Sequence, residues 1–258
     1  MPAIAVIPSR YASTRFPGKP LCPLLGKPMI QHVYERVRKA ALVTQVVVAT
    51  DDERIYTAVE EFGGTAVMTS RDHQSGTDRI AEAIMLLEAK APGLVCDPVV
   101  NVQGDEPLIM PAMVDDVVRL MEDGRTAIGT LVKRIDAAAE VDDPNVVKAV
   151  FDEEGFALYF SRAPIPYHRD LFGAEGWKDR ASALAMYKHI GIYAYRRKVL
   201  AALSALPPSK LEMKEKLEQL RALEKGLKIK IKETSYETIG VDTPLDVERV
   251  ERCLSLYS

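Results

Sequence analysis

Short apolar segments and segments of helical periodicity alternate through the first 129 residues, and this alternation constrains the fold more than any other feature. Apolar runs typical of buried strands lie at residues 3–7, 46–49, 65–68 and 99–102. Apolar residues spaced three and four apart predict helices near residues 30–37, 54–62, 80–87 and 113–121. Four strand–helix repeats predict a mostly parallel central sheet with helices on both faces, and such sheets bind ligands beyond the carboxyl ends of their strands.

The remainder of the chain has a mixed pattern. Two strand-like segments, 147–151 and 157–160, flank the sequence D-E-E-G, which predicts a hairpin with Gly155 in its turn. Further strands are predicted at 190–195 and 229–234, and helices at 197–203, 212–225 and from Pro244 onward, with Thr243 as the last N-cap. We therefore predict an α/β core in residues 1–129 and a smaller mixed α/β extension in residues 130–258.

Composition disfavours several classes of protein. The 258 residues carry 34 Lys and Arg against 37 Asp and Glu, a net charge of -3, so no general basic field is present to bind nucleic acid or a membrane surface. Cys22, Cys96 and Cys253 are few, odd in number and far apart, which argues against a disulfide framework and suits a reducing cytoplasm. No signal-peptide pattern is seen, and no apolar run approaches the roughly 20 residues of a membrane span.

The first predicted strand leads into I-P-S-R-Y-A-S-T-R-F-P-G-K-P, a stretch of small residues with three positive charges. Arg10 and Arg15 offer forked donors, and Lys19 offers a mobile point charge. Together with backbone N–H groups, they suit a polyanion such as a nucleoside triphosphate. The spacing matches neither G-x-G-x-x-G nor G-x-x-x-x-G-K-[ST], which disfavours a dinucleotide fold and an ordinary P-loop. The alternative is a solvated basic loop.

Two carboxylates lie at predicted element ends. Asp105 follows a buried strand in V-V-N-V-Q-G-D-E-P, and Asp242 precedes the last helix in G-V-D-T-P-L-D. Mg²⁺ in nucleotide sites is held by one or two carboxylates together with phosphate oxygens and waters, so this pair could bind Mg²⁺ beside the first loop. For each residue the alternative is a role as a helix cap.

Two further regions carry polar residues that could contact a ligand. The stretch T-S-R-D-H-Q-S-G-T-D-R could read a base edge through Arg71, Asp72, Ser75 and Gly76. The alternative is that Ser75 or Thr77 caps the next helix. Arg162, in Y-F-S-R-A-P-I-P-Y, could pair with a substrate carboxylate, and His189, in K-H-I-G-I-Y, could bond sugar hydroxyls. A surface arginine and a structural histidine are the alternatives.

Taken in order, these segments resemble the CMP-Kdo synthetases, or 3-deoxy-manno-octulosonate cytidylyltransferases, over nearly the whole chain. The matching stretches include I-P-S-R-Y-A-S-T-R-F-P-G-K-P-L, D-H-Q-S-G-T-D-R, V-N-V-Q-G-D-E-P, A-L-Y-F-S-R-A-P-I-P-Y, H-I-G-I-Y, L-E-Q-L-R and G-V-D-T-P-L-D. The first loop and Q-G-D-E-P are also similar to CMP-sialic acid synthetases, whereas S-G-T-D-R, F-S-R-A-P-I-P and H-I-G-I-Y are more specific to the Kdo branch. The resemblance implies a Rossmann-like nucleotidyltransferase fold.

The resemblance also implies roles for individual residues. The CTP phosphates would be held by Arg10, Ser13 and Lys19, with Arg15 in the same loop. Cytosine and ribose would lie at Arg71, Asp72, Ser75 and Gly76. Gln103 would lie at the reacting centre, and Asp105 and Asp242 would bind Mg²⁺. The sugar side would comprise Arg162, His189, Tyr193, Glu218 and Gln219. We expect Arg10, Lys19, Gln103 and Asp105 to act in catalysis.

The implied activity is transfer of CMP from CTP to the anomeric hydroxyl of 3-deoxy-D-manno-octulosonate (Kdo), with release of pyrophosphate, for lipopolysaccharide biosynthesis. A related acidic sugar, 8-amino-Kdo or sialic acid, is the alternative acceptor. Two other classes are a nucleotide-binding regulatory module without catalysis and a nicotinamide oxidoreductase, which the missing glycine fingerprint disfavours. The resemblance further implies a cytoplasmic homodimer, in which residues 130–258 bind the sugar, form the dimer contact and return the last helix to the active site.

Overall fold

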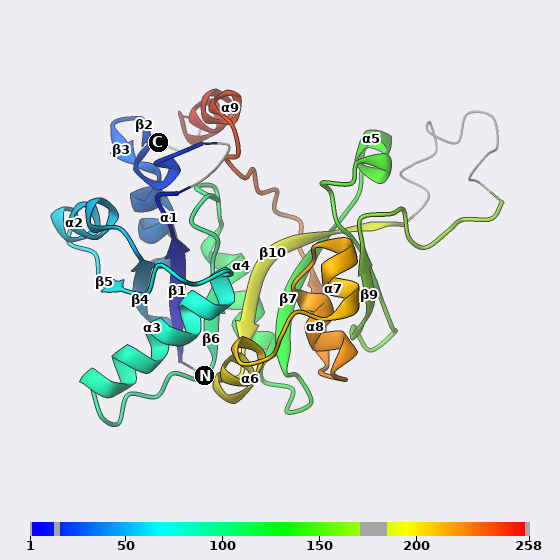
Figure 1. Ribbon diagram of the computed structural model, residues 1–258. Coiled ribbons are helices and arrows are strands. Elements are labelled where there is room, and N and C mark those ends of the chain that lie inside the picture. The colour runs from blue at the N-terminus through cyan, green and yellow to red at the C-terminus, as the bar shows by residue number, and fades with distance from the viewer. Residues whose placement is uncertain (1, 13–15, 171–184, 256–258) are drawn as a thin grey trace.

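A computed structural model of the protein describes residues 2–12, 16–170 and 185–255. Within these residues nine strands form one sheet in the order β11-β7-β10-β6-β1-β4-β5, with β8 beside β10 and β9 beside β8 (Figure 1). The strands are β1 (Ala3–Ser9), β4 (Val43–Thr50), β5 (Ala66–Met68), β6 (Val99–Asn101), β7 (Ile128–Arg134), β8 (Lys148–Phe151), β9 (Ala157–Ser161), β10 (Tyr187–Tyr195) and β11 (Ile229–Glu233). A separate small hairpin joins β2 (Pro23–Leu24) to β3 (Lys27–Pro28).

The central sheet is mostly parallel, as predicted. β1 runs parallel to β4 and β6, β4 to β5, and β7 to β11. β10 is antiparallel to β6, β7 and β8, so it reverses the direction of the chain within the sheet. Strands from beyond residue 129 therefore extend the same sheet. A division of the chain near residue 129 remains a prediction.

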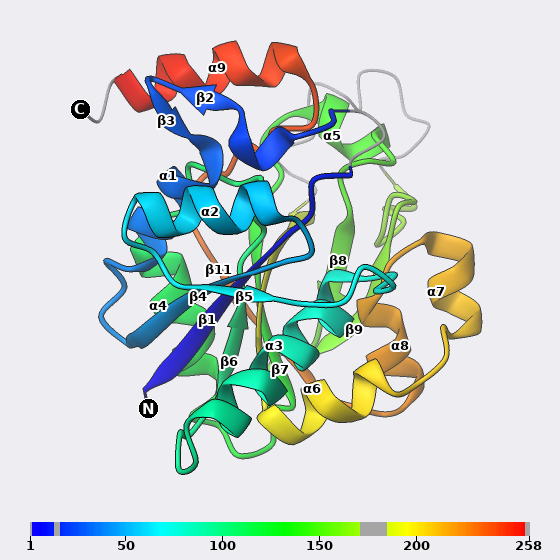
Figure 2. The ribbon, with the colours of Figure 1, turned by 60° about the vertical axis from the view of Figure 1, so that its left-hand side comes forward.

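Helices cover both faces of the sheet (Figure 2). They are α1 (Met29–Val37), α2 (Glu53–Glu61), α3 (Gly76–Lys90), α4 (Pro111–Leu120), α5 (Ala138–Asp142), α6 (Arg197–Ser204), α7 (Lys210–Glu215), α8 (Gln219–Glu224) and α9 (Pro244–Ser255). The alternation of side chains along β1 explains the two layers. Ala5 and Ile7 pack with α1, α2 and α4, whereas Ile4 and Val6 pack with α3, α6 and α8.

The predicted hairpin in the extension is confirmed. β8 and β9 pair in antiparallel register, and Gly155 lies in the turn with a φ of +79°, a conformation that favours glycine. β10 is long enough to have two neighbours along one edge, because Tyr187 and Lys188 pair with β8 whereas residues 193–195 pair with β6. This strand therefore connects the hairpin to the parallel core.

The single helix predicted at residues 212–225 is wrong, because the chain forms two short helices there. A capping box between Ser209 and Glu212 starts α7, and Lys216, with a φ of +54°, ends it in the left-handed region. The break lets the chain turn inward, so that Leu217 is buried in the core and α8 begins at Gln219.

The last helix begins at Pro244, as predicted, and packs on the β2–β3 hairpin. Leu24, Val250 and Leu254 share a small apolar cluster there. The carboxylate of Asp246 accepts hydrogen bonds from the backbone N–H groups of Asp242 and Thr243, at 3.1 and 2.8 Å. These bonds fix the residues immediately before α9 beside the carboxyl end of the sheet.

The contact between β7 and α4 depends on a glycine. A Cβ at Gly129 would lie 3.0 Å from the Val117 carbonyl oxygen and 3.1 Å from Leu120 Cβ. We expect Gly129→Ala to lower the free energy of unfolding by about 1–3 kcal/mol, because the strand and helix must separate. Urea unfolding measures the loss. The control Gly124→Ala, whose Cβ would meet nothing within 4 Å, should change it by at most about 0.5 kcal/mol. Equal losses in the two variants would contradict the packing argument.

Candidate active site

The first loop, residues 10–20, begins where β1 ends and closes through a short 3-10 helix, η1 (Lys19–Leu21). Gly18 turns the chain with a φ of +71°, and its N–H donates to the Tyr11 carbonyl oxygen at 3.0 Å. A Cβ at Gly18 would lie 3.0 Å from the Tyr11 ring, so glycine also allows the two segments to approach. The closed loop directs Lys19 toward the sheet edge. Two predicted phosphate ligands in this loop, Ser13 and Arg15, lie outside the described residues.

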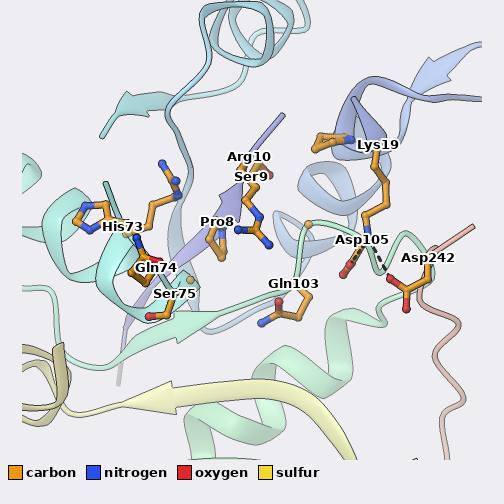
Figure 3. Close-up of a pocket in the computed structure, with 14 residues that line it drawn as sticks. Pro8, Ser9, Arg10, Lys19, His73, Gln74, Ser75, Gln103, Asp105 and Asp242 are labelled. Carbon is orange, nitrogen blue, oxygen red and sulfur yellow. Dashed lines mark hydrogen bonds and ion pairs between the residues drawn. The ribbon is translucent and has the colours of Figure 1, made fainter. Parts of the chain in front are cut away.

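Lys19 joins the two predicted metal ligands. Its Nζ donates to Asp105 Oδ2 at 2.6 Å and to Asp242 Oδ1 at 3.4 Å (Figure 3). The backbone ties the same segments together, because the Val241 N–H donates to the Asp105 carbonyl oxygen at 2.9 Å. Two carboxylates that converge on one cation form a donor set that also suits a divalent metal ion.

The structure does not support the alternative that Asp105 and Asp242 serve as helix caps. Met110 precedes α4 and no side chain caps that helix, so Asp105 does not serve as its cap. At α9 the carboxylate that accepts backbone N–H groups belongs to Asp246. The carboxylates of Asp105 and Asp242 are instead turned toward Lys19.

A cavity of about 290 Å³, which we call cavity A, opens at the carboxyl ends of β1 and β6. Figure 3 shows the side chains of Arg10 and Lys19 reaching from the first loop toward Gln103 and Asp105, on its walls. A glycine forms part of its floor, because a Cβ at Gly104 would lie 2.7 Å from Ser9 Oγ and 3.1 Å from the Pro8 carbonyl oxygen. Close approach of the two strand ends thus requires glycine there.

The amino end of α3 forms the opposite wall of cavity A. Ser75 caps the helix, since its Oγ accepts the N–H of Asp78 at 3.1 Å, as the cap alternative predicted. Ser75 and Gly76 also line the cavity, so capping and ligand contact are compatible. The unpaired N–H groups and the dipole of the helix favour an anion at this position.

Arg79 holds the segment before α3 against the sheet. Its buried guanidinium donates to Thr69 Oγ1 at 2.6 Å and to Asp51 Oδ2 at 2.7 Å. Arg71 and Asp72, predicted to contact the base, are exposed, and neither lines cavity A. His73 and Gln74 from the same stretch line it, and a contact of Arg71 and Asp72 with the base and ribose stays a prediction.

A second cavity of about 250 Å³, cavity B, adjoins cavity A through the shared residues Gly76 and Gln103. Four residues predicted for the sugar side line it, namely His189, Tyr193, Glu218 and Gln219. The break between α7 and α8 places Glu218 and Gln219 in this wall. Gln103 is held between the cavities, because its Nε2 donates to Asn101 Oδ1 at 3.2 Å.

Arg162 is not in the wall of either cavity. Its Nε donates to the Glu215 carbonyl oxygen and its Nη1 to the Pro144 carbonyl oxygen, each at 2.7 Å. The Arg162 N–H donates to Glu215 Oε2 at 3.0 Å. In this arrangement the guanidinium anchors the end of β9 to α7, and its role toward a sugar remains a prediction.

Burial shifts the titration of the groups in cavity B toward their neutral forms. It lowers the pKa of His189 to about 3 and raises the pKa values of Tyr193 and Tyr195. Burial also raises the pKa of Glu218, although the nearby hydroxyls of Thr77 and Ser75 oppose the rise. Cavity B therefore presents mainly neutral hydrogen-bonding groups.

Several residues near the cavities had no ligand-binding role assigned from the sequence. Asn101, Thr77 and Tyr195 line cavity B. Glu106 lies beside Asp105, and burial together with the charge of Asp105 raises its pKa to about 7. Glu106 stands within Q-G-D-E-P and Thr77 within S-G-T-D-R, so the motifs offered a signal for both, whereas Tyr195 resembles an ordinary core residue.

A basic loop after the first strand, facing two carboxylates across a parallel sheet edge, defines the protein as a nucleotidyltransferase-type α/β protein. The sequence model of the cytidylyltransferase family matches residues 4–230. The chain belongs to the cytidylyltransferase family.

Proteins of similar sequence match this chain over nearly its full length. The chain is 55% identical to the 3-deoxy-manno-octulosonate cytidylyltransferase of Geotalea uraniireducens, over 97% of this chain and 98% of that protein. It is 52% identical to the enzyme of the same name from Thermodesulfovibrio yellowstonii, over 100% of both. The solved structure of a CMP:2-keto-3-deoxy-manno-octonic acid synthetase complexed with CTP superimposes with a TM-score of 0.88 at 45% identity, over 100% of both chains. The predicted fold and family are confirmed.

The low pKa of His189 should make stability depend on pH. Because burial moves the pKa from its usual 6.5 to about 3, only the unfolded chain takes up the proton as pH falls between those values. The free energy of unfolding should therefore decrease as the pH falls. When the pH is lowered from about 7 to about 5, the free energy of unfolding should decrease in both proteins. We expect the decrease to be about 1–2 kcal/mol smaller in His189→Gln than in the unsubstituted protein. Urea unfolding at both pH values provides the test, and parallel losses would show that His189 does not contribute.

Proposed function

We propose that this protein transfers CMP from CTP to the anomeric hydroxyl of Kdo and releases pyrophosphate, in lipopolysaccharide biosynthesis. The observation that carries the proposal is the junction of two cavities at Gln103 and Gly76, one with basic side chains and paired carboxylates and the other lined by buried polar groups. The names of the full-length relatives support the same reaction. A nucleotide in cavity A and a sugar in cavity B would meet beside Gln103.

Cavity A has the groups that a nucleoside triphosphate needs. Arg10 and Lys19 would hold the phosphates, and the amino end of α3 would add backbone donors at Ser75 and Gly76. We assign Ser13 and Arg15 to the same phosphates by their place in the first loop. Arg71 and Asp72 are assigned to the cytosine and ribose by their place in the sequence, next to His73 and Gln74 in the wall of this cavity.

Asp105 and Asp242 would hold Mg²⁺, because both carboxylates already face one cation. Bound Mg²⁺ supplies charge neutralisation and a lower pKa for the attacking hydroxyl. Among the described residues no group of three or more His, Cys, Asp or Glu is placed to bind a metal ion, which suits an ion completed by phosphate oxygens. Lys19 would then donate to the phosphates instead of to the carboxylates.

Cavity B would orient the acceptor. His189, Tyr193, Glu218 and Gln219 would bond the sugar hydroxyls, and Arg162 would reach the sugar carboxylate if it left its carbonyl partners. The anomeric oxygen would attack the α-phosphorus in line, forming one P–O bond as the bond to pyrophosphate breaks. Arg10 and Lys19 would stabilise the charge that develops on the leaving pyrophosphate.

We also propose a cytoplasmic homodimer that contacts neither nucleic acid nor membrane. We assign the contact between two copies to the β8–β9 hairpin of the extension, where Leu158 is 62% exposed on the outermost strand. Within the described residues, no helix is long and apolar enough to cross a membrane. The three cysteines are free thiols, as a reducing compartment would keep them.

A pyrophosphate-release assay with CTP, Mg²⁺ and a panel of Kdo, 8-amino-Kdo and sialic acid tests the reaction and its acceptor. We expect Asp105→Asn to lower the rate with Kdo at least about 100-fold, because one metal ligand is weakened. The control Asp136→Asn changes an exposed carboxylate outside both cavities and should retain activity. CTP binding without pyrophosphate release from any sugar would indicate a regulatory module instead.

A second variant separates catalysis from stability. Lys19→Met should lower the rate of pyrophosphate release about 100- to 1,000-fold, since it removes a donor to the leaving group. Its effect on urea unfolding should stay within about 1 kcal/mol, because each Lys19 ion pair has a partly exposed carboxylate. Lys27→Met, which breaks the exposed pair with Glu35, is the matched control. A Lys19 variant that only unfolds more easily would assign the loop a structural role.

A further inference from the structure

A buried threonine lies behind the histidine of cavity B. Thr130, on β7, is 0% exposed, and its Oγ1 lies 2.9 Å from His189 Nε2. The same oxygen lies 2.7 Å from the Ile192 carbonyl oxygen and 3.3 Å from that of Ile190. These carbonyl groups lie at an irregularity in the pairing of β10 with β7. Ile190 pairs with Leu131 and Tyr193 pairs with Thr130, so Gly191 and Ile192 have no paired residue in β7.

The single proton of the Thr130 hydroxyl determines the direction of these hydrogen bonds. A carbonyl oxygen only accepts, so the 2.7 Å contact with Ile192 requires the hydroxyl proton to point there. If the proton pointed to His189, two oxygen lone pairs would face each other at that distance without a proton between them. The hydroxyl therefore donates to Ile192, and its oxygen accepts a proton from His189 Nε2.

The other ring nitrogen of His189 is left as an acceptor. The ring is neutral near pH 7, because burial holds its pKa far below that value, so a proton on Nε2 leaves Nδ1 unprotonated. Within the described part of the chain, no residue donates a hydrogen bond to Nδ1. The ring also packs edge-on against Phe160, at a centroid distance of 5.1 Å, and contacts Tyr193, so its orientation in the wall of cavity B is fixed.

We propose that Thr130 is a positioning residue that fixes His189 in its Nε2–H tautomer, so that cavity B offers Nδ1 as an acceptor to a hydroxyl of the sugar. Thr130 itself does not touch the substrate. The sugar part of this inference rests on the proposed function, whereas the tautomer is a property of the protein alone. An acceptor at this position selects sugars that carry a donor there, and it disfavours analogues in which that hydroxyl is missing or replaced by an acceptor.

Nuclear magnetic resonance of the ligand-free, full-length protein with ¹⁵N-labelled histidine tests the tautomer directly. Long-range ¹H–¹⁵N correlations distinguish protonated from unprotonated ring nitrogens, and the signals of His189 are those that disappear in His189→Gln. We expect a protonated Nε2 and an unprotonated Nδ1, unchanged from pH 7 to about pH 5. A protonated Nδ1, or two protonated nitrogens, would overturn the proposal.

Variants of Thr130 test whether the tautomer of His189 affects binding of the sugar. Thr130→Val keeps the shape but removes the hydroxyl, so a proton on the buried Nε2 would have no acceptor and the Nδ1–H tautomer should predominate. The KM for Kdo should then rise about 5- to 10-fold, because most molecules lose the acceptor. The KM for CTP should change less than about twofold, because cavity A is intact. Thr130→Ser restores the hydroxyl and should restore both the spectrum and the KM for Kdo.

Thr126→Val is the matched control, since Thr126 is equally buried and its Oγ1 has no hydrogen-bond partner among the described residues. It should alter neither the His189 spectrum nor either KM. An unchanged tautomer and KM in Thr130→Val would refute the positioning role. If Thr130→Val does not fold, the unsubstituted spectrum and Thr130→Ser still decide. If no acidic sugar is a substrate, the proposed function is wrong. The tautomer of His189 can still be determined, because that spectrum is recorded on the ligand-free protein.

Discussion

One ammonium group joins three segments that are distant in the sequence, and the candidate active site depends on that contact. Lys19 comes from the first loop, Asp105 from the turn after β6, and Asp242 from the residues before α9. Without a cation between them, the two carboxylates would repel each other. With it, the first loop and the last helix are held over the carboxyl ends of the parallel strands, where the order of the strands already leaves room for a ligand.

Much of the core and of cavity A could be predicted because the signals are local. The apolar run at residues 3–7 became β1, and the periodic residues at 30–37 became α1. Parallel strands end at one edge of a sheet, so residues that directly follow β1 and β6 had to lie near one another. The structure places Ser9 and Gly104 close together for this reason, and the closed first loop then returns Lys19 to Asp105.

The rest depends on contacts that no local pattern records. β10 enters the sheet antiparallel between β6 and β7, a choice set by packing of the whole extension. The left-handed residue Lys216 splits a segment whose apolar spacing suits one helix. The donors of Arg162 are taken by carbonyl groups from two other segments. Thr130 stands in an apolar strand without any motif, and only its neighbours on β10 give it a role.

The irregularity in β10 also limits how this chain can change in length. Two residues are added between Ile190 and Tyr193, so the alternation of faces is preserved, and His189 stays on the same side of the sheet as Tyr193 and Tyr195. The loss or gain of one residue there would turn both tyrosines to the opposite face. Insertions and deletions at this point should therefore be tolerated only in pairs, so the spacing between His189 and Tyr193 can change only by even numbers of residues.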